Sequence, residues 1–255
     1  MKQLSFYNGK GGVGKTTLTE MFASWLRYSE NTRVLVLDFE EPNSRIQQER
    51  DKELGLLKDE SSVLFSYIRR NPCDISPYEI VHAQVDDADY SIKGLVTFRD
   101  RIWDYIESVQ DKYDYVLFDF PAGFHVGSLS YSFLMSGICD FIVVPVDTTS
   151  ITCLEGLQTA RYLLSNEQKV VMLWNRVTVD EINREGYLEA VESTFKDFGF
   201  DFLRHRIKSF QRARRDSDSN LFVKSTLCWP QKYVELACPQ LIELFRDMKD
   251  RMDRL

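Results

Sequence analysis

The chain has 255 residues, of which 44% are hydrophobic and 28% are charged, and its formal net charge is −7. This composition predicts a folded protein with a large apolar core, and it excludes the disordered and fibrous classes. The negative balance excludes a general polyanion-binding surface, so any contact with nucleic acid requires a local basic patch.

Apolar runs of strand length alternate with amphipathic stretches along the whole chain. The first half is expected to contain strands at Leu4–Tyr7, Arg33–Phe39 and Tyr115–Phe120, and helices at Thr16–Tyr28, Ser44–Leu57, Ser62–Arg70 and Thr97–Lys112. Near-continuous apolar strands of this kind are typical of a buried parallel sheet. The stretch Asn71–Gly94 is interrupted by prolines and is predicted to be irregular.

The alternation continues in the second half of the chain. This half is expected to contain strands at Phe141–Val146 and Val170–Trp174, and helices at Ile151–Leu164, Asn183–Phe198 and Tyr233–Arg254. Strands separated by helices imply βαβ units and a mainly parallel sheet. Because such crossovers are almost always right-handed, the predicted fold class is α/β, a three-layer α/β/α sandwich, in one domain covering residues 1–255.

A glycine-rich motif lies between the first predicted strand and the first predicted helix. It matches the pattern G-x-x-x-x-G-K-[ST] and consists of Gly9, Lys10, Gly11, Gly12, Val13, Gly14, Lys15, Thr16 and Thr17. The glycines let the backbone turn and point its N–H groups at phosphate oxygens, and the helix that follows adds the positive end of its dipole. Lys15 is expected to reach the β- and γ-phosphates, Thr16 to bind Mg²⁺ and Thr17 to contact the α-phosphate. The motif predicts that ATP and Mg²⁺ bind here.

Lys10 is a second lysine inside the same loop. Its side chain starts on the outer side of the loop, so it cannot easily reach the γ-phosphate that Lys15 contacts. One interpretation is that Lys10 reaches across a dimer interface to the nucleotide of a partner. The alternative is a solvated surface lysine.

Acidic residues close two of the predicted strands, with Asp38 and Glu40 at one end and Asp119 at another. Ligands of open parallel sheets bind at the carboxyl ends of the strands, so Asp38 and Asp119 are candidate Mg²⁺ ligands. For Asp119 the alternative is a helix cap. Glu40 is expected to orient or deprotonate the attacking water, with Glu41 as the alternative. Gly123 gives the loop after Asp119 the freedom to respond to a γ-phosphate.

Taken together, these motifs resemble the deviant Walker A ATPases, the ParA/MinD/Soj group, over most of the chain. The resemblance rests on KGGVGKTT (Lys10–Thr17), VLVLDFEEP (Val34–Pro42), YDYVLFDFPAG (Tyr113–Gly123), VVPVDTTSITCLEGL (Val143–Leu157) and VVMLWNR (Val170–Arg176). It implies a P-loop NTPase fold and an ATPase that is slow until a partner protein stimulates it.

The resemblance also implies roles for single residues. Lys10 matches the signature lysine that enters the partner's site in an ATP-bound homodimer, and with Lys15 and Glu40 it forms the expected catalytic set. Asp38 and Asp119 match the magnesium-site acids. Asn175 matches a position that commonly recognises adenine, with Arg176 beside it.

The cargo implied by the resemblance is DNA, in plasmid or chromosome partition, with a ParB-like activator protein. Two alternatives stay open, namely a MinD-like protein-positioning ATPase and a conjugative-transfer accessory ATPase that does not bind DNA.

The chain also departs from the family. The usual D-x-D-P-Q reads DFEEPN at residues 38–43, the usual D-x-P-P-G reads DFPAG at residues 119–123, and Asn71–Gly94 looks unlike the family. The first departure concerns the rate of hydrolysis and not the binding of ATP, and the last is a candidate partner-specific surface.

A basic stretch without acids lies at residues 204–215. It contains Arg204, Arg206, Lys208, Arg212, Arg214 and Arg215. If residues 208–215 are helical, Lys208, Arg212 and Arg215 share one face, which is a candidate contact for the phosphates of DNA. The alternative is a solvated helix whose charges pair with acids such as Asp216 and Asp218.

Neither a membrane span nor a disulfide framework is expected. No apolar run approaches the roughly 18 residues that cross a bilayer, and the N-terminal apolar part is too short for a signal peptide, so we expect a cytoplasmic protein. The amphipathic segment Gln240–Leu255 has balanced charges and is expected to dock on the core. Five scattered cysteines without a C-x-x-C pair predict reduced thiols.

Other nucleotide-dependent classes fit less well. An iron protein of the nitrogenase type needs two cysteines per subunit near a dimer axis, and the loop after Asp119 has none. A GTPase would carry an [NT]-K-x-D motif, which is absent from the sequence. The doubled lysine of the glycine-rich loop argues against a small-molecule kinase.

Overall fold

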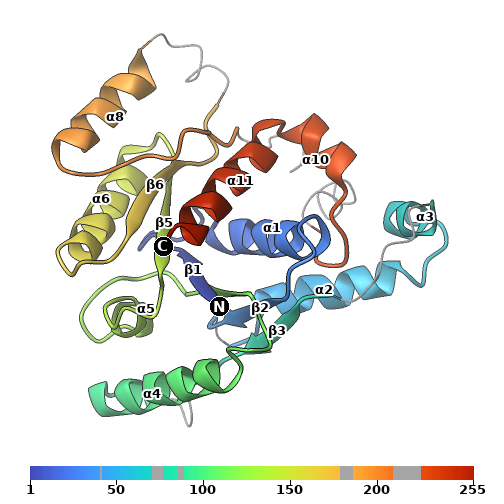
Figure 1. Cartoon of the computed structure of the whole chain (residues 1–255), viewed down its shortest axis with the longest axis horizontal. Helices are drawn as coiled ribbons and strands as arrows, with labels where there is room; N and C mark the ends of the chain where they lie inside the picture. Colours follow the sequence, from blue (N-terminus) through green and yellow to red (C-terminus); the bar gives the residue numbers. More distant parts are fainter. Residues whose placement is uncertain (41, 71–76, 86–88, 179–185, 209–224) are drawn as a thin grey trace.

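The structure is a computed structural model that describes residues 1–40, 42–70, 77–85, 89–178, 186–208 and 225–255. Its centre is a parallel sheet with the strand order β3-β2-β4-β1-β5-β6 (Figure 1). The strands are β1 (Lys2–Phe6), β2 (Val34–Asp38), β3 (Glu79–His82), β4 (Tyr115–Asp119), β5 (Phe141–Val146) and β6 (Val170–Trp174). The helices are α1 (Lys15–Tyr28), α2 (Arg45–Leu56), α3 (Val63–Arg70), α4 (Ile92–Ser108), α5 (Leu129–Leu134), α6 (Ser150–Leu164), α8 (Tyr187–Asp197), α10 (Gln231–Ala237) and α11 (Gln240–Asp253).

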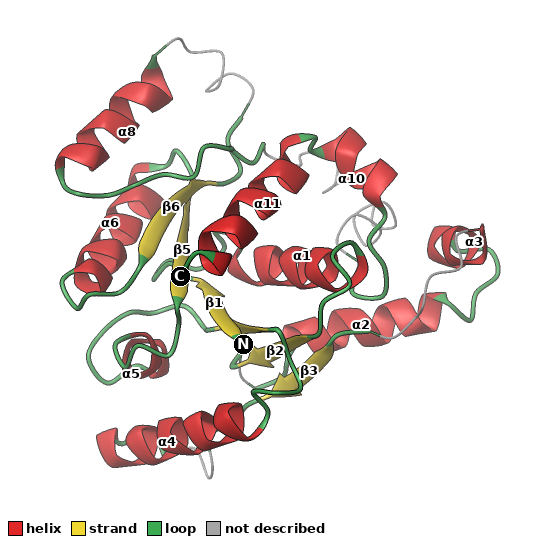
Figure 2. Ribbon diagram, in the orientation of Figure 1, coloured by secondary structure: helices red, strands yellow, loops and turns green. Residues whose placement is uncertain are grey.

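Helices cover both faces of the sheet (Figure 2). Alternate side chains of one strand enter different cores, as in β4, where Leu117 packs in the core under α1 and α11 while Phe118 packs in the core under α4, α5 and α6. This alternation follows from the pleat, because successive side chains of a strand point to opposite faces. The predicted α/β/α sandwich is confirmed.

The carboxyl ends of the central strands meet at one edge of the sheet. β1 lies between β4 and β5, so the loop after β1 opens at the middle of this edge. The register pairs Asp38 at the end of β2 with Asp119 at the end of β4. Parallel pairing therefore brings together residues that are far apart in the sequence, beside the glycine-rich loop.

The region predicted to be irregular, Asn71–Gly94, contains a strand and the start of a helix, so that prediction was wrong. β3 pairs with β2 as an edge strand and is only partly buried, which explains its weak apolar pattern. Helix α4 begins at Ile92, before the predicted Thr97, because the Ser91 side chain accepts the N–H of Gly94 as an N-cap. It also ends at Ser108, before the predicted Lys112.

Two further differences concern the second half of the chain. The helix predicted over Tyr233–Arg254 is two helices, α10 and α11, because Pro239 stands between them and cannot continue α10. The short helix α5 was not predicted. The helix predicted from Asn183 begins at Tyr187 in the described part, since residues 179–185 lie outside it.

The C-terminal helix α11 docks on the core, as expected from its balanced charges. Its apolar side chains Leu241, Leu244, Phe245, Met248 and Met252 are fully buried. Phe245 contacts the rings of Phe22 and Trp25 on α1, with centroid distances of 5.1 and 5.8 Å. Among the helices that the structure describes, none has the length and apolar character needed to cross a bilayer.

Four of the cysteines fall within the described residues. Cys139, Cys228 and Cys238 are buried and Cys153 is partly buried, and they form no disulfide with one another. Burial raises the pKa of the Cys153 thiol to about 11, so this thiol stays protonated near neutral pH. Cys73 lies outside the described residues.

Candidate functional site

The glycine-rich loop of residues 9–14 joins β1 to α1, as its motif predicts. Gly12 and Gly14 have φ angles of +77° and +97°, in the left-handed region that favours glycine. Among the described residues, no acceptor takes the backbone N–H groups of Gly11 to Gly14. These N–H groups and the start of α1 form a ready site for an anion.

Lys15 occupies the interior of this loop. Its side chain is buried, and its Nζ donates to the carbonyl of Lys10 at 3.2 Å. The same Nζ lies 5.8 Å from the centre of the Tyr7 ring. Burial lowers the pKa of Lys15, while the nearby charges of Asp119 and Glu40 oppose this shift. The Lys15 amino group is thus held inside the loop by a carbonyl that an incoming phosphate can replace.

Asp119 is a buried acidic side chain that its neighbours compensate only in part. It is 1% exposed, and neither of its carboxylate oxygens has a hydrogen-bond partner within the described residues. Burial raises the pKa of Asp119 to about 8; the charges of Asp38 and Glu40 add to this, and the Thr16 hydroxyl and Lys15 oppose it. A buried carboxylate in this state fits a missing cation, and Thr16 lies close enough to share it.

Asp38, beside it, is engaged by the chain that follows β2. Its Oδ1 accepts the N–H of Glu40 at 2.9 Å, and its Oδ2 accepts the hydroxyl of Ser44 at 2.6 Å. Ser44 is also the N-cap of α2, since its hydroxyl oxygen accepts the N–H of Gln47 at 3.0 Å. Asp38 therefore fixes the start of α2 and leaves lone pairs for a magnesium-bound water. The N-cap pattern could have found Ser44 from the sequence.

Glu40 lies near enough to the phosphate loop for its charge to act on the groups there. Its negative charge acts to raise the pKa of Asp119 and opposes the lowering of the pKa of Lys15. Its Oε2 is buried without a hydrogen-bond partner in the described part of the chain. The Glu40 carbonyl lies 2.8 Å from Nε2 of His82 on β3, which fixes the backbone at this point. The structure thus brings Glu40 into the site, whereas Glu41 lies outside the described residues.

Asn8 and Thr159 support the start of the loop and were missed from the sequence. The Asn8 side chain accepts the N–H of Lys10 at 2.9 Å and donates to the carbonyl of Pro145 at 2.9 Å. The hydroxyl of Thr159 on α6 accepts the N–H of Gly9 at 3.3 Å. An asparagine directly before the loop is a visible signal, because its side chain can satisfy local backbone groups.

The described residues contain no group of three or more His, Cys, Asp or Glu side chains that could hold a metal ion on its own. Mg²⁺ is commonly held by one or two carboxylates together with phosphate oxygens and water. Asp119, Asp38 and Thr16 fit that arrangement, with the remaining ligands supplied by a nucleotide.

Comparison with known proteins supports the same assignment. A family model described as an AAA domain matches residues 1–173. The chain belongs to the ParA/MinD family of P-loop ATPases. No curated protein matches the chain in sequence.

Solved structures share the fold of this ParA/MinD-family chain at low sequence identity. MinD in the MinC:MinD cell division complex of Aquifex aeolicus is 20% identical with a TM-score of 0.64, over 98% of this chain and 96% of that one. Apo McdA of Cyanthece is 16% identical with a TM-score of 0.61, over 98% of both chains. A Borrelia burgdorferi B31 protein described as a plasmid partition protein and bound to AMPPNP is 16% identical with a TM-score of 0.57, over 97% of this chain and 99% of that one.

In this ParA/MinD-family chain, the residues after β6 hold the phosphate loop from outside. The side-chain amide of Asn175 donates to the Val13 carbonyl at 2.7 Å, and Nη1 of Arg176 donates to the Gly12 carbonyl at 2.5 Å. Asn175 is buried, and Arg176 has a φ angle of +62°. Both residues therefore lie beside the loop, where they act as a brace. Recognition of adenine by Asn175 stays a prediction.

Lys10 and Thr17 complete the predicted phosphate-loop set. The Lys10 side chain is exposed. Thr17 is partly buried in the first turn of α1. Exposure of Lys10 fits both interpretations of this residue, the dimer contact and the solvated surface lysine.

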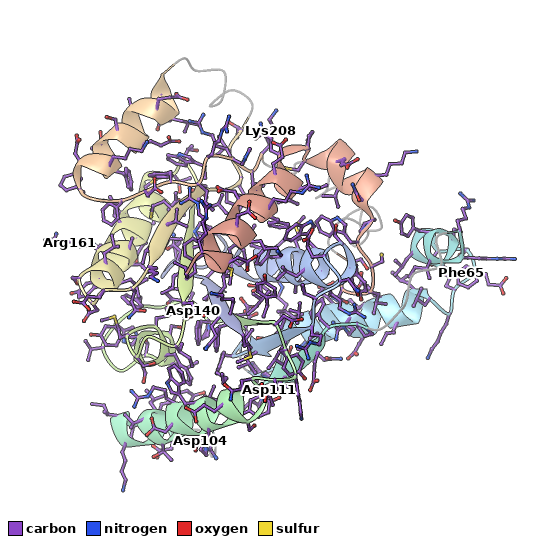
Figure 3. All side chains as sticks on the ribbon, viewed as in Figure 1. Phe65, Asp104, Asp111, Asp140, Arg161 and Lys208 are labelled. Carbon is purple, nitrogen blue, oxygen red and sulfur yellow. The ribbon has the colours of Figure 1, made fainter. Side chains whose placement is uncertain are left out.

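Only part of the basic stretch lies within the described residues. Arg206 forms ion pairs with Glu189 and Glu192 of α8, at 2.8 and 2.9 Å. Lys208 (labelled in Figure 3) is exposed and forms a strand-like bridge with Val177, so the helix considered over residues 208–215 does not include it. Arg204 is exposed. Arg212, Arg214 and Arg215 lie outside the described residues.

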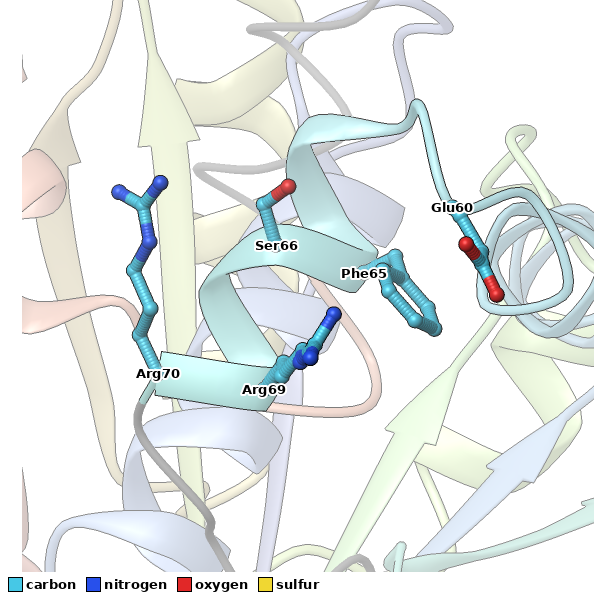
Figure 4. Close-up of a pocket in the computed structure, with 5 residues that line it drawn as sticks. All are labelled: Glu60, Phe65, Ser66, Arg69 and Arg70. Atoms are coloured by element: carbon cyan, nitrogen blue, oxygen red, sulfur yellow. The ribbon is translucent and has the colours of Figure 1, made fainter.

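A pocket separate from the phosphate loop lies on α3 (Figure 4). It is lined by Glu60, Phe65, Ser66, Arg69 and Arg70. None of these residues belongs to the predicted site, and α3 has its own small apolar cluster with Leu64, Ile68 and Cys228.

Proposed function

We propose that this chain is a Mg²⁺-dependent ATPase and that residues 1–255 form a single ParA-like ATPase domain. The observation that carries the proposal is the buried Asp119 carboxylate without a hydrogen-bond partner in the described structure, next to Lys15 and a loop of unused N–H groups. A buried carboxyl whose pKa is raised to about 8 ionises readily only when a cation binds beside it, and the N–H groups need an anion. MgATP supplies both.

The residues would divide the work as follows. The N–H groups of residues 11–14 and Lys15 would bind the phosphates, while Thr16, Asp38 and Asp119 would hold Mg²⁺. When bound, Mg²⁺ supplies positive charge that neutralises the phosphate oxygens. Glu40 would orient the attacking water or take its proton, because its carboxylate is near enough to act on the charges of both Lys15 and Asp119. Asn175 and Arg176 would lie on the side of the nucleotide base.

We propose that binding of ATP produces a homodimer. The exposed Lys10 would enter the site of a second copy and share the charge of the triphosphate with that copy's Lys15. ATP would thereby hold two subunits together, and hydrolysis would release them. The resemblance of the sequence to ParA/MinD proteins supports this role.

The proposed cellular role is DNA partition or the positioning of a mobile element, in the cytoplasm and with a ParB-like activator. Support comes from the Borrelia burgdorferi partition protein among the structural neighbours. The MinD neighbour, described as a cell division protein, fits the alternative of a MinD-like protein-positioning ATPase that does not bind DNA. Because Arg206 is paired with acids, DNA binding would depend on the remaining basic residues of the stretch 204–215.

Two lysine substitutions test the ATPase and the dimer separately. Lys15→Ala should abolish the binding of MgATP in calorimetry, because it removes the cation inside the loop. Lys10→Ala should keep MgATP binding but lose the dimer that light scattering detects with a slowly hydrolysed ATP analogue. Lys112→Ala is the matched control, since Lys112 is exposed at the opposite end of β4. Absence of MgATP binding by the wild-type protein would refute the ATPase proposal, and an unchanged dimer in Lys10→Ala would remove the role of Lys10.

Binding to DNA has its own test. Affinity for a duplex of arbitrary sequence should require ATP and should fall steeply with salt, because phosphate contacts release counterions. Arg204→Ala combined with Lys208→Ala should reduce the slope of that salt dependence. Failure to bind DNA with ATP at low salt would favour the positioning ATPase.

A further inference from the structure

Tyr7 is a buried side chain that the proposed mechanism does not use. It follows β1 directly, is fully buried, and donates its hydroxyl to the carbonyl of Gly123 at 2.8 Å. Burial raises the pKa of Tyr7 to about 12, so the hydroxyl stays protonated and remains a donor at neutral pH. The contact spans 116 positions of the sequence, so local structure does not impose it.

Gly123 is the point where the loop after β4 meets the phosphate loop. Its N–H donates to the carbonyl of Gly9 at 2.9 Å, while its own carbonyl accepts the Tyr7 hydroxyl and, at 3.3 Å, the hydroxyl of Ser128. Its φ angle is +102°, and an added Cβ would meet nothing within 4 Å. The requirement for glycine therefore comes from the backbone conformation and not from crowding.

The Tyr7 ring contacts the same loop on both sides of Gly123. Its centroid lies 6.3 Å from that of Phe120 in an edge-on arrangement and 5.8 Å from that of Phe124. Phe120 directly follows Asp119, the carboxylate that would bind Mg²⁺. Tyr7 thus contacts the loop at three points within five residues of that carboxylate.

These contacts join β1 and its following loop to β4 and its following loop at two points, which together form a short closed ring of backbone. β1 pairs with β4 up to Ser5 and Phe118, and beyond this pair the two chains are joined again at Gly123. Asp119 lies inside the ring, between the last strand pair and the Gly123 contacts. The backbone of Asp119 is also held by β2, since its carbonyl accepts the N–H of Phe39 at 2.9 Å. The Gly123 contacts therefore fix the chain that leaves Asp119 relative to the phosphate loop.

We propose that Tyr7 is a positioning residue for the ATPase reaction, whose hydroxyl holds the loop Asp119–Gly123 in register with the phosphate loop. The inference rests on the proposed function, and it adds a residue outside the phosphate-loop motif to the reaction. The competing interpretation is that Tyr7 is a core residue with a purely structural role. Its hydroxyl would then need a hydrogen-bond partner only because it is buried, and any acceptor would do.

Tyr7→Phe isolates the hydroxyl, because it keeps the ring contacts. We expect kcat for ATP to fall about fivefold, the size of one hydrogen bond lost in the transition state, while the Kd for MgATP stays within about twofold. Hydrogen exchange of the amides in residues 120–124 should become faster, and a slowly hydrolysed ATP analogue should restore less protection than in wild type.

Tyr131→Phe is the matched control. Tyr131 contacts the same Phe124 ring, at 5.2 Å between centroids, and its hydroxyl makes no hydrogen bond within the described residues. We expect this variant to keep the kcat and exchange rates of wild type.

An unchanged kcat and unchanged exchange in Tyr7→Phe would overturn the proposal, as would a loss of kcat that only follows a loss of nucleotide affinity. Wild type provides a second test that needs no variant, because without nucleotide the amides of residues 120–124 should exchange more slowly than those of the exposed residues 125–127. Equal exchange in the two segments would also overturn the proposal. Failure of wild type to bind MgATP would instead refute the proposed function, which this exchange measurement does not require.

Discussion

Gly14 and Asn175 offer a quantitative test of how the phosphate loop is held. A Cβ added at Gly14 would lie 2.6 Å from the amide nitrogen of Asn175, and Gly14 has a φ angle of +97°. The same amide donates to the carbonyl of the buried Val13 at 2.7 Å. Gly14→Ala should therefore both strain the backbone and displace Asn175 from Val13.

The expected free energies follow from these two effects. A non-glycine residue in the left-handed region costs about 1–2 kcal/mol. Asn175→Ala leaves the Val13 carbonyl buried without a partner, which costs about 1–3 kcal/mol. Gly14→Ala should combine both terms, at about 2–5 kcal/mol. The double variant should lose no more than Gly14→Ala alone, because the Asn175 contact is already lost in that variant.

Urea denaturation of the four proteins without nucleotide measures this cycle. The sum of the losses in unfolding free energy of the two single variants should exceed the loss of the double variant by about 1–3 kcal/mol. Gly199→Ala is the control for strain alone, since its φ angle is +84° and an added Cβ would meet nothing within 4 Å. Additivity within about 0.5 kcal/mol would refute the reasoning, because Asn175 would then not depend on the space at Gly14.

Three further predictions use the same denaturation methods. Asp119→Asn should stabilise the protein without Mg²⁺ at neutral pH by roughly 1–3 kcal/mol, because it removes a carboxyl that must take up a proton to be buried, but MgATP should no longer raise its melting temperature. Burial raises the pKa of Glu53, so its contribution to stability should fall as pH rises above the ordinary value of 4.5. Glu53→Gln, whose carbonyl can still accept the bonds from Thr226, should therefore gain stability relative to wild type as pH rises above about 4.5. A pH-independent difference between these two proteins would contradict this. Phe39→Ala should cost about 3–5 kcal/mol, because its ring packs within 5.0 Å of Phe120 and Phe133, whereas Phe198→Ala, at a side chain that is 71% exposed, should cost less than about 0.5 kcal/mol.

The sequence predicted most of the fold because the central strands are apolar along their whole length. Phe141–Val146 and Val170–Trp174 match the structure at both ends, since strands buried on both faces carry no competing pattern. β3 was missed because an edge strand with exposed and half-buried positions has no such run. α5 was missed because six residues give little helical periodicity.

The part of the candidate site that follows from the parallel direction of the strands was predictable from the sequence. A parallel sheet brings strand ends to one edge, so Asp38 and Asp119 could be expected together, and the register confirms that they are neighbours. The contacts of Tyr7 with Gly123, of Asn8 with Pro145 and of Thr159 with Gly9 could not be predicted, because each joins residues more than 100 positions apart. Side-chain bonds of this kind follow from packing and leave no periodic pattern in the sequence.

The bracing of the phosphate loop from β6, α6 and the loop after β4 has a consequence for the kinetics of nucleotide capture. With the Gly12, Val13 and Gly9 backbone already held by side chains and by Gly123, ATP does not have to order the chain that receives it. Association should therefore lose little conformational entropy and proceed without a slow ordering phase. Discrimination between ATP and ADP is then left to the parts that can still change partners, above all the ammonium group of Lys15, which must exchange the Lys10 carbonyl for a phosphate oxygen.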